Sequence, residues 1–478
     1  LLYSNKQPMK PLFTILALLL TVVATAAEPV QIGTNIQLMW DDSLIESHVN
    51  ASFKYHRPIP KDVAITTDAP WEGNVSAYFT FLQDGDEYRA YYRGSHYDTE
   101  RKLVTHREVT CVAVSKDGIH WTKPKLNLWE FDGSKENNIV WDGIGTHCFA
   151  PFLDDNPACP KNERYKAVSR GRFVTGDFDV PERQKGVVGL YIFTSPDGLN
   201  WTLKTQKPVI TDGAFDSQNI AFWDSNKGRY VCYSRLFING VRAIQYCESP
   251  DFTTWTKPTP IDYNAEYREH LYTNAIQQYP RNPKLYIGMP TRYLPTENSR
   301  VEPIFMHSHD GMKFLRNQEP FIPESFPQDR SGNRSNYACR GILQLPHSDT
   351  TYSIFATEAY YTGVDSRVRR FELRMDGYRS ISTTGQAQIV TKPIVLEGDA
   401  LFLNSQTRGK GGIWVDLLDE DSKPIPGFSK LEADGLGGDS ISNEVCWKQG
   451  RTLKELRGKP VKIHITFSNS DIYSLQIK

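Results

Sequence analysis

Ser195-Pro-Asp-Gly-Leu-Asn-Trp201 decides the fold, because the chain repeats this stretch. Near copies begin at Ser115, Ser249 and Ser308, and a degenerate fifth copy is Arg374-Met-Asp-Gly-Tyr378. The shared pattern is Ser-x-Asp, then Gly or Phe, then two variable residues and Trp or Phe. Its aspartates, at positions 117, 197, 251, 310 and 376, are 80, 54, 59 and 66 residues apart. Self-similarity of this kind is typical of a repeat architecture.

Each copy is predicted to form a tight turn after a strand. The Asp side chain can accept hydrogen bonds from backbone amides two residues on, and Gly tolerates a positive φ. The aromatic residue that follows is expected to fold back and pack between neighbouring units. The motif therefore counts structural units and lies in their outer turns, away from any central axis.

The composition is that of a globular chain rich in aromatic residues. Its 478 residues suffice for two domains and a large core. A net charge of −1 with 23% charged residues fits neither a nucleic-acid-binding nor a disordered protein, so no nucleic-acid partner is expected. Aromatic residues make up 12%, which suits both short packed strands and sugar-stacking surfaces, and composition does not separate the two.

The first 27 residues are predicted to be a secretory signal peptide. Met9-Lys10 is followed by an apolar run from Leu12 to Val23 and by Ala24-Thr-Ala-Ala27, which is the basic, apolar and small-residue order of such signals. Residues 1–8 are interpreted as an over-extended start. The apolar run is short for a membrane span, although an anchor is an alternative. The mature protein is expected to be secreted or periplasmic, without a membrane span.

Seven cysteines are present, an odd number without a CxxC motif or zinc spacing. Cys111 and Cys232 lie in strand-like runs and are expected to be buried. A bridge between Cys148 and Cys159, or between Cys232 and Cys247, is compatible with export, and the sequence does not decide between pairing and free thiols.

Residues 28–378 are predicted to form a five-bladed β-propeller. Strand alternation is visible in Glu87-Tyr-Arg-Ala-Tyr-Tyr-Arg93 and in similar runs, and no long helical stripe occurs, so helices should be few and short. Aligned on the repeated turns, the chain gives five units of inner, middle, third and outer strand. The early strand Gln37-Leu-Met-Trp40 is expected to complete the last blade. An insertion at 171–187 is expected to be a loop near the axis mouth.

Residues 379–478 are predicted to form a β-sandwich accessory domain. Ile413-Trp-Val-Asp-Leu417 and Val461-Lys-Ile-His-Ile-Thr-Phe467 alternate in the manner of half-buried strands. The expected role of this domain is packing on the propeller, with carbohydrate binding as an alternative.

Three carboxylates are candidate catalytic groups, because the inner strands of a propeller converge on one pocket. Glu72, Asp216 and Glu269 stand near the predicted starts of inner strands one, three and four. Converging carboxylates raise one another's pKa, and an acid beside an ionised partner is what glycosidic cleavage needs. Asp41-Asp42 is a rival for the carboxylate of blade one. The alternative for each residue is an ordinary turn cap or an arginine partner.

The same alignment predicts a set of substrate-binding residues: His147, Asn219, His270, Arg292, Arg340 and Glu358. Arg334 and Asn336 are further candidates from blade five, and arginines here could hold a sugar carboxylate or sulfate. No cofactor is predicted. His147 and His270 could bind a structural metal ion at the axis or contact sugar hydroxyls, and hydrogen-bonded polar lining is the favoured alternative.

Several stretches resemble a group of exported bacterial proteins usually labelled glycosyl hydrolase family 32-like: Trp40-Asp-Asp-Ser-Leu-Ile-Glu46, Glu136-Asn-Asn-Ile-Val140, Phe215-Asp-Ser-Gln-Asn219, Phe222-Trp-Asp224 and Glu269-His-Leu-Tyr272. This group is similar to the five-bladed propeller glycoside hydrolases of families 32, 43 and 117. The resemblance covers roughly residues 36–478 and implies hydrolysis of a glycosidic bond by acids from the inner strands. The sequence departs from the pattern of these hydrolases at blade two, which has His147, and at blade three, which has Asp216. The Trp-Met-Asn-Asp-Pro-Asn-Gly motif of invertase-like enzymes is absent.

Three functional hypotheses follow. The first is an exported glycoside hydrolase that acts on a poly- or oligosaccharide. The second is a sialidase-like hydrolase, which would require six blades and an arginine triad. The third is a non-catalytic carbohydrate-binding propeller, which would be favoured if Glu72, Asp216 and Glu269 did not share a pocket. Oligomeric state, the sugar and its linkage stay open.

Overall fold

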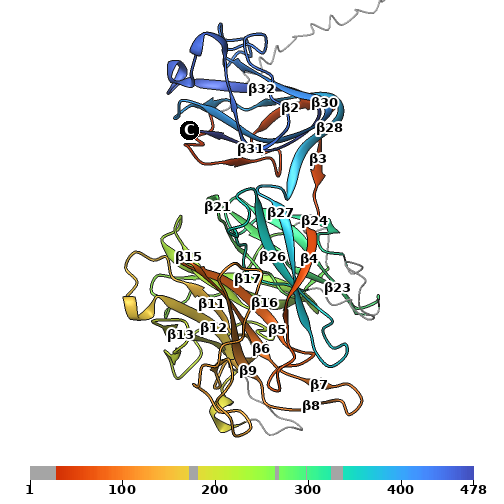
Figure 1. The fold of residues 1–478 in the computed structure, drawn as a ribbon. Helices are drawn as coiled ribbons and strands as arrows, with labels where there is room; N and C mark the ends of the chain where they lie inside the picture. The colour runs from red at the N-terminus through yellow and green to blue at the C-terminus, as the bar shows by residue number, and fades with distance from the viewer. Residues whose placement is uncertain (1–27, 172–180, 264–268, 298, 324–336) are drawn as a thin grey trace, which may run out of the picture.

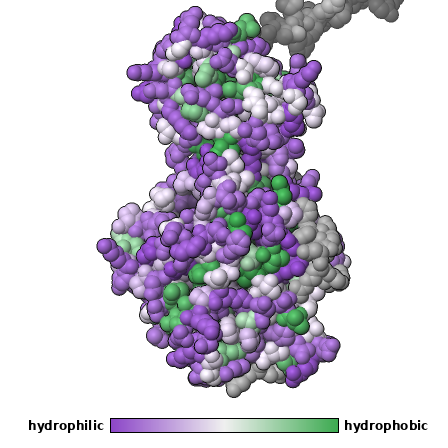
Figure 2. Space-filling model, in the orientation of Figure 1, coloured by the Kyte–Doolittle hydropathy of each residue, from purple (hydrophilic) through white to green (hydrophobic). Residues whose placement is uncertain are grey.

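The computed structural model describes residues 28–171, 181–263, 269–297, 299–323 and 337–478. These residues form an all-β protein, whose only helical elements are five short 3₁₀ turns. The expectation of few and short helices is therefore confirmed. Figure 1 shows two bodies, a propeller and a smaller body above it, and Figure 2 shows a narrow waist between them.

Five antiparallel sheets form the five blades of the predicted propeller, which is confirmed. Each sheet runs from an inner strand near the axis to an outer strand. Blade one comprises β5 (Ala77–Asp84), β6 (Glu87–Gly94), β9 (Val109–Ser115) and β10 (Ile139–Trp141). Blade two comprises β11 (Ala150–Leu153), β12 (Tyr165–Gly171), β13 (Gly189–Ser195) and β14 (Thr202–Leu203). Blade three comprises β15 (Ile220–Asp224), β16 (Arg229–Ile238), β17 (Val241–Ser249) and β18 (Thr259–Pro260).

Blades four and five complete the circle. Blade four is a six-stranded sheet of β19 (His270–Leu271), β20 (Gln277–Tyr279), β21 (Asn282–Gly288), β22 (Thr291–Leu294), β23 (Arg300–Ser308) and β24 (Phe314–Pro320). Blade five comprises β25 (Tyr337–Ala338), β26 (Thr351–Glu358), β27 (Arg367–Arg374) and β4 (Ile59–Thr66). A separate hairpin joins β7 (Tyr97–Asp98) to β8 (Leu103–Val104).

An N-terminal strand closes the last blade, but it is not the predicted one. β4 pairs with β27 as the outer strand of blade five. The predicted closing stretch Gln37–Trp40 instead contains β1 (Gln37–Leu38), which pairs with β32 (Pro460–Ile477) of the C-terminal body. Trp40 packs edge-on against aromatic rings of blade four and the end of blade five, including Tyr279 and Tyr378, so this segment joins the two bodies.

The repeated turns have the predicted geometry in the four good copies. In blade two, Asp197 Oδ1 accepts hydrogen bonds from the amides of Leu199 (2.9 Å) and Asn200 (2.8 Å). Gly198 has a φ of 75°, the left-handed conformation that favours glycine. The indole of Trp201 donates to the carbonyl of Gly198 (2.9 Å). Its ring centroid lies 6.2 Å from that of Tyr91 in blade one, so it packs between blades as expected.

The degenerate fifth copy has a different role. Asp376 is fully buried and accepts hydrogen bonds from Tyr279 of blade four (2.6 Å) and from Ser474 of the C-terminal body (2.7 Å). Arg281 of blade four forms an ion pair with the same carboxylate at 2.5 Å. The fifth copy therefore fastens the propeller to the C-terminal body.

The C-terminal body is one eight-stranded antiparallel sheet with its own apolar core. Its strands are β1, β2 (Ile45–Val49), β3 (Ser52–Tyr55), β28 (Arg379–Thr391), β29 (Ile394–Val395), β30 (Leu401–Leu418), β31 (Asp439–Val445) and β32. The register breaks between Thr383 and Gln386 and between Thr407 and Gly412. A two-sheet sandwich over residues 379–478 stays a prediction.

Other local predictions have mixed outcomes. All seven cysteines are free, and Cys111 and Cys232 are buried as expected. The predicted signal peptide and most of the 171–187 insertion lie outside the described residues. Within the described part of the chain, no helix is long and apolar enough to pass through a bilayer.

Candidate functional site

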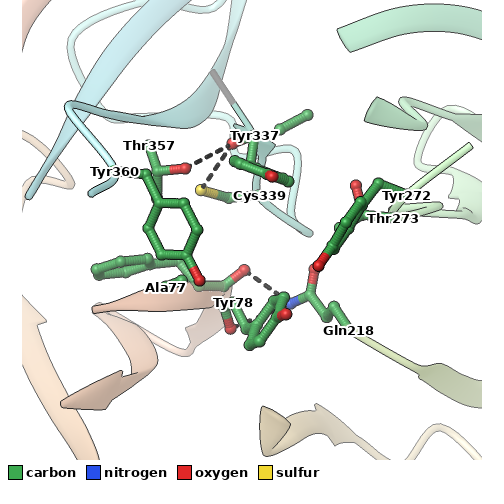
Figure 3. Close-up of a pocket in the computed structure, with 11 residues that line it drawn as sticks. Ala77, Tyr78, Gln218, Tyr272, Thr273, Tyr337, Cys339, Thr357 and Tyr360 are labelled. Atoms are coloured by element: carbon green, nitrogen blue, oxygen red, sulfur yellow. Dashed lines mark hydrogen bonds between the residues drawn. The ribbon is translucent and has the colours of Figure 1, made fainter. Parts of the chain in front are cut away.

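A small pocket lies at the end of the propeller axis where the inner strands begin (Figure 3). Four blades contribute to it: Tyr78 from blade one, Gln218 from the loop before β15, Tyr272 from blade four, and Tyr337 and Tyr360 from blade five. The cavity has a volume of about 10 Å³, which is room for one water-sized group. The four tyrosines around the cavity, here called the tyrosine floor, surround a space too small for a ring-sized ligand.

Backbone strain at Tyr78 marks this end of the axis. Tyr78 has a φ of 59°, which is rare for a bulky residue. The register between β5 and β6 breaks at the same place, between Ala77 and Thr80, as in a β-bulge. The Gln218 amide holds the bulge by donating to the carbonyls of Tyr78 (3.2 Å) and Phe79 (2.9 Å). Strain of this kind costs about 1–3 kcal/mol and concentrates at functional sites.

Three side chains in contact, Glu108, His147 and Asp216, lie beside this floor. His147 Nε2 lies 2.7 Å from Asp216 Oδ1, and His147 Nδ1 lies 3.0 Å from Glu108 Oε2. Each ring nitrogen of His147 therefore faces one carboxylate. The imidazole of His147 also packs against the ring of Tyr78, with centroids 5.7 Å apart. The structure thus brings two predicted residues, Asp216 and His147, together with Glu108, which was not predicted.

Arg93 connects these three side chains to the pocket. Its guanidinium lies 3.7 Å from Glu108, 3.2 Å from His147 Nδ1 and 4.9 Å from the ring centroid of Tyr78. It also donates a hydrogen bond of 2.8 Å to the hydroxyl of Tyr360. Arg93 and Glu108 are nearly fully buried. A buried arginine of blade one therefore holds groups from blades two and five in place.

Asp216 is the exposed residue among these three side chains. Its side chain is 51% exposed, and Arg170 and Arg235 approach it at 2.8 and 4.0 Å. Burial raises its pKa, but the hydrogen bond with His147 and the charges of His147, Arg170 and Arg235 outweigh burial and hold the pKa well below its ordinary range. The carboxylate is therefore ionised at neutral pH.

Burial raises the pKa of the Tyr78 phenol well above its ordinary value. Tyr272, Tyr360 and Asp216 raise this pKa further, and the charge of Arg93 lowers it by less. The hydroxyl therefore keeps its proton and can act as a hydrogen-bond donor. The tyrosine floor offers neutral polar groups beside one ionised carboxylate.

The arginines at this site follow a repeat that the turn motif did not reveal. Each middle strand contains a tyrosine, and the residue five positions later is Arg93, Arg170 or Arg235 in blades one to three. The same position is threonine in blades four and five, at Thr291 and Thr357. Aligning the middle strands would therefore have predicted three arginines at the axis mouth. The approach of Glu108 to His147 depends on packing between blades, and no local pattern indicates it.

Glu72 lies apart from this group. It precedes β5 by five residues, and its side chain is fully buried. Its carboxylate forms an ion pair with Lys123 at 2.6 Å and accepts a hydrogen bond from Tyr92 at 2.5 Å. The loop before β5 is longer than the predicted register allowed, so Glu72 borders a separate surface pocket with His96, His106 and other residues.

Glu269 also has partners of its own. Its carboxylate lies 3.4 Å from Arg292 and 3.5 Å from Arg316. Arg292 pairs in addition with the buried Glu302. His270, the next residue, contacts the backbone amide of Arg242 at 3.2 Å, and burial followed by the charge of Arg242 lowers its pKa. Within the described residues, no hydrogen bond or ion pair joins any two of Glu72, Asp216 and Glu269.

The remaining predicted residues have other surroundings. Asn219 donates to the carbonyls of Phe215 and Ser217 and so shapes the loop that carries Asp216. Arg340 is buried, reaches the Pro151 carbonyl at 3.4 Å, and burial lowers its pKa to about 10. Glu358 is fully buried in ion pairs with Arg367 (2.7 Å) and Arg369 (2.5 Å).

The rival carboxylate Asp41 is buried near the waist, bound by His307 (3.0 Å) and His309 (2.9 Å). Arg334 and Asn336 lie outside the described residues. Over the described ranges, no three His, Cys, Asp or Glu side chains are grouped so as to hold a metal ion.

Three solved structures to which the chain is distantly similar are carbohydrate-active enzymes. A β-1,2-mannobiose phosphorylase from Listeria innocua is 13% identical, with a TM-score of 0.44 over 68% of this chain and 97% of that one. A family 62 α-L-arabinofuranosidase catalytic domain from Coprinopsis cinerea is 10% identical, with a TM-score of 0.45 over 66% and 97%. A family 32 β-fructofuranosidase from Bombyx mori is 10% identical, with a TM-score of 0.41 over 89% and 94%.

No protein-family model and no curated protein matches the chain. The five-bladed propeller that the resemblance implies is present in the described residues. Similarity this distant assigns no activity. The sialidase-like alternative required six blades and is contradicted by the five that the described residues form.

Proposed function

We propose that the protein is an exported glycoside hydrolase that binds a poly- or oligosaccharide at the axial tyrosine floor. Asp216 is the carboxylate that faces the sugar. The observation that carries the proposal is its placement: a half-exposed, ionised carboxylate beside a strained bulge and a ring of tyrosines at the axis mouth. Aromatic faces and a fixed carboxylate suit the apolar faces and the hydroxyl groups of sugars.

Asp216 can act as the base or the nucleophile of glycosidic cleavage, because its charged neighbours keep it ionised. His147 fixes the carboxylate's orientation and is itself fixed by Glu108. The hydroxyls of Tyr78 and Tyr360 are available to donate hydrogen bonds to the sugar. The catalytic roles of Glu72 and Glu269 stay predictions, and their ion pairs favour structural roles.

A non-catalytic carbohydrate-binding propeller is the second candidate. It is favoured by the separation of the three carboxylates, since Glu72 and Glu269 are each engaged by basic partners away from Asp216. Both candidates require sugar binding at the same floor, and only the first requires cleavage.

A screen of the purified protein against plant and algal oligosaccharides, with products separated by chromatography, tests the proposal. Asp216→Asn should lower the cleavage rate by about 10²-fold or more, whereas Glu72→Gln should retain it. Cleavage by Asp216→Asn at the wild-type rate would refute the assignment of the site. Binding without cleavage by the wild type would establish the second candidate.

A further inference from the structure

Two arginines of blade three stack on one tyrosine of the axial floor. Arg235, near the end of β16, lies 5.2 Å from the ring centroid of Tyr272, and Arg242, near the start of β17, lies 5.1 Å from the same ring. Both also approach the ring of Phe237, at 5.5 and 5.4 Å. These distances are within the range of cation–π contacts.

Arg242 has no carboxylate partner among the described residues. Its charged group contacts a ring nitrogen of His270 at 3.3 Å, and it stacks on Tyr293 as well as Tyr272. Its Nε is buried and lacks a hydrogen-bond partner within the described structure. A guanidinium has five donors and cannot deprotonate, and most of those of Arg242 have no partner among the described residues.

Arg235 is only weakly neutralised. Its Nε donates to the carbonyl of Ala214 at 2.9 Å, and its nearest carboxylate oxygen is that of Asp216, 4.0 Å away. Asp216 is already engaged by His147 at 2.7 Å and by Arg170 at 2.8 Å. The two guanidinium groups around Tyr272 therefore form a local excess of positive charge.

Cation–π contacts offset part of the cost of this arrangement, but they satisfy no N–H donor. An anion would supply hydrogen-bond acceptors for these N–H groups, since planar guanidinium groups bind carboxylate and sulfate oxygens through paired hydrogen bonds. Both arginines approach the ring of Phe237, which is 49% exposed, so an apolar sugar face could rest beside the anion.

We propose that the glycan bound at the axial floor is acidic, and that Arg235 and Arg242 bind its anionic group, a uronate carboxylate or a sulfate ester. This inference rests on the proposed function for the presence of a glycan at the floor. It adds the chemical class of the substrate and places the charged subsite on the blade-three side of Tyr272.

Affinity measurements on the full-length protein test this inference without requiring cleavage. Three probes are compared by calorimetry: tetragalacturonate, a sulfated carrageenan tetrasaccharide and neutral xylotetraose. At least one acidic probe should bind about tenfold or more tightly than the neutral one, and added salt should weaken that binding. The acidic probe that binds identifies carboxylate or sulfate as the anion.

Variants separate the charged subsite from general effects on folding. Arg242→Met keeps the aliphatic stem and should reduce acidic-probe affinity about tenfold or more, with little change for the neutral probe. Arg235→Lys keeps the charge but loses the planar fork and should give an intermediate loss. Arg229→Met is the control, because Arg229 also lies on β16 but is 46% exposed and faces Glu248.

Equal affinity for acidic and neutral probes, or unchanged acidic-probe affinity in a folded Arg242→Met variant, would overturn the inference while leaving the proposed function standing. Absence of binding by all three probes and by the wider oligosaccharide screen would overturn both. A thermal unfolding curve of each variant shows whether it is folded.

Discussion

Replacing Glu108 with glutamine tests the charged network on which the candidate site depends. Glu108 lies 3.7 Å from Arg93 and 3.0 Å from His147, and the Glu108 and Arg93 side chains are only 6% and 4% exposed. Glutamine keeps the shape of the side chain and removes its charge. Arg93 would then lose its ion pair with Glu108, and His147 would keep only Asp216 of the two carboxylates that it contacts.

The expected loss of unfolding free energy is about 3 kcal/mol. Removing one partner of a buried ion pair costs about 3–5 kcal/mol, because the other charge is left without compensation. The lower end applies here, since the glutamine oxygen can still accept one hydrogen bond. Urea denaturation followed by tryptophan fluorescence gives the difference by linear extrapolation.

Glu136→Gln is the matched control. Glu136 pairs with Lys125 at 2.8 Å, but their side chains are 67% and 66% exposed, and exposed pairs of this kind contribute about 0–1 kcal/mol. A loss for Glu108→Gln no larger than that of the control would refute the buried network and, with it, the claim that Glu108 fixes His147 and Asp216.

Two further predictions concern the blades and the waist. Trp201→Ala should lower the unfolding free energy by about 3–5 kcal/mol, because the buried indole packs between blades one and two; a loss below about 1 kcal/mol in the same denaturation assay would argue against that packing. At the waist, the hydrogen bond with Asp41 raises the pKa of His309, so its contribution is complete below the ordinary histidine pKa of about 6.5 and is lost as pH rises through the raised value. Stability should therefore fall between pH 6 and pH 9 in the wild type and fall less in His309→Gln, and equal slopes would show that His309 is not responsible.

The repeated turn could be predicted because its determinants are local. Asp197 accepts bonds from amides two and three residues ahead, and Gly198 supplies the positive φ within the same seven residues. The register of blade one could not be predicted in this way. The chain makes a turn around Gly73 before β5 begins, and that turn carries Glu72 into a contact with Lys123, 51 residues away. Ion pairs between distant segments have no sequence pattern at the scale of one strand.

The prediction of the closing strand was wrong for a related reason. Gln37–Trp40 and Ile59–Thr66 both contain a short apolar run, and either could complete a blade by pattern alone. The choice is made by the C-terminal sheet, since β32 takes β1 as a partner. β4 then remains to pair with β27 of blade five. A prediction that considers only the propeller cannot include the competition between β32 and β27 for the N-terminal strands.

The arginine repeat explains why the charge at the axis is uneven. All three arginines stand at the end of a middle strand, so the fold delivers them to the same mouth whether or not a partner exists there. Blade one compensates Arg93 with the buried Glu108, and Asp216 forms a 2.8 Å pair with Arg170. Arg235 is left 4.0 Å from that same carboxylate, with Arg242 beside it on Tyr272. Blades four and five avoid the problem with threonine. Threonine at this position in blades four and five shows that a middle strand does not need an arginine there, and the positive charge of blade three is what the proposed anionic group would neutralise.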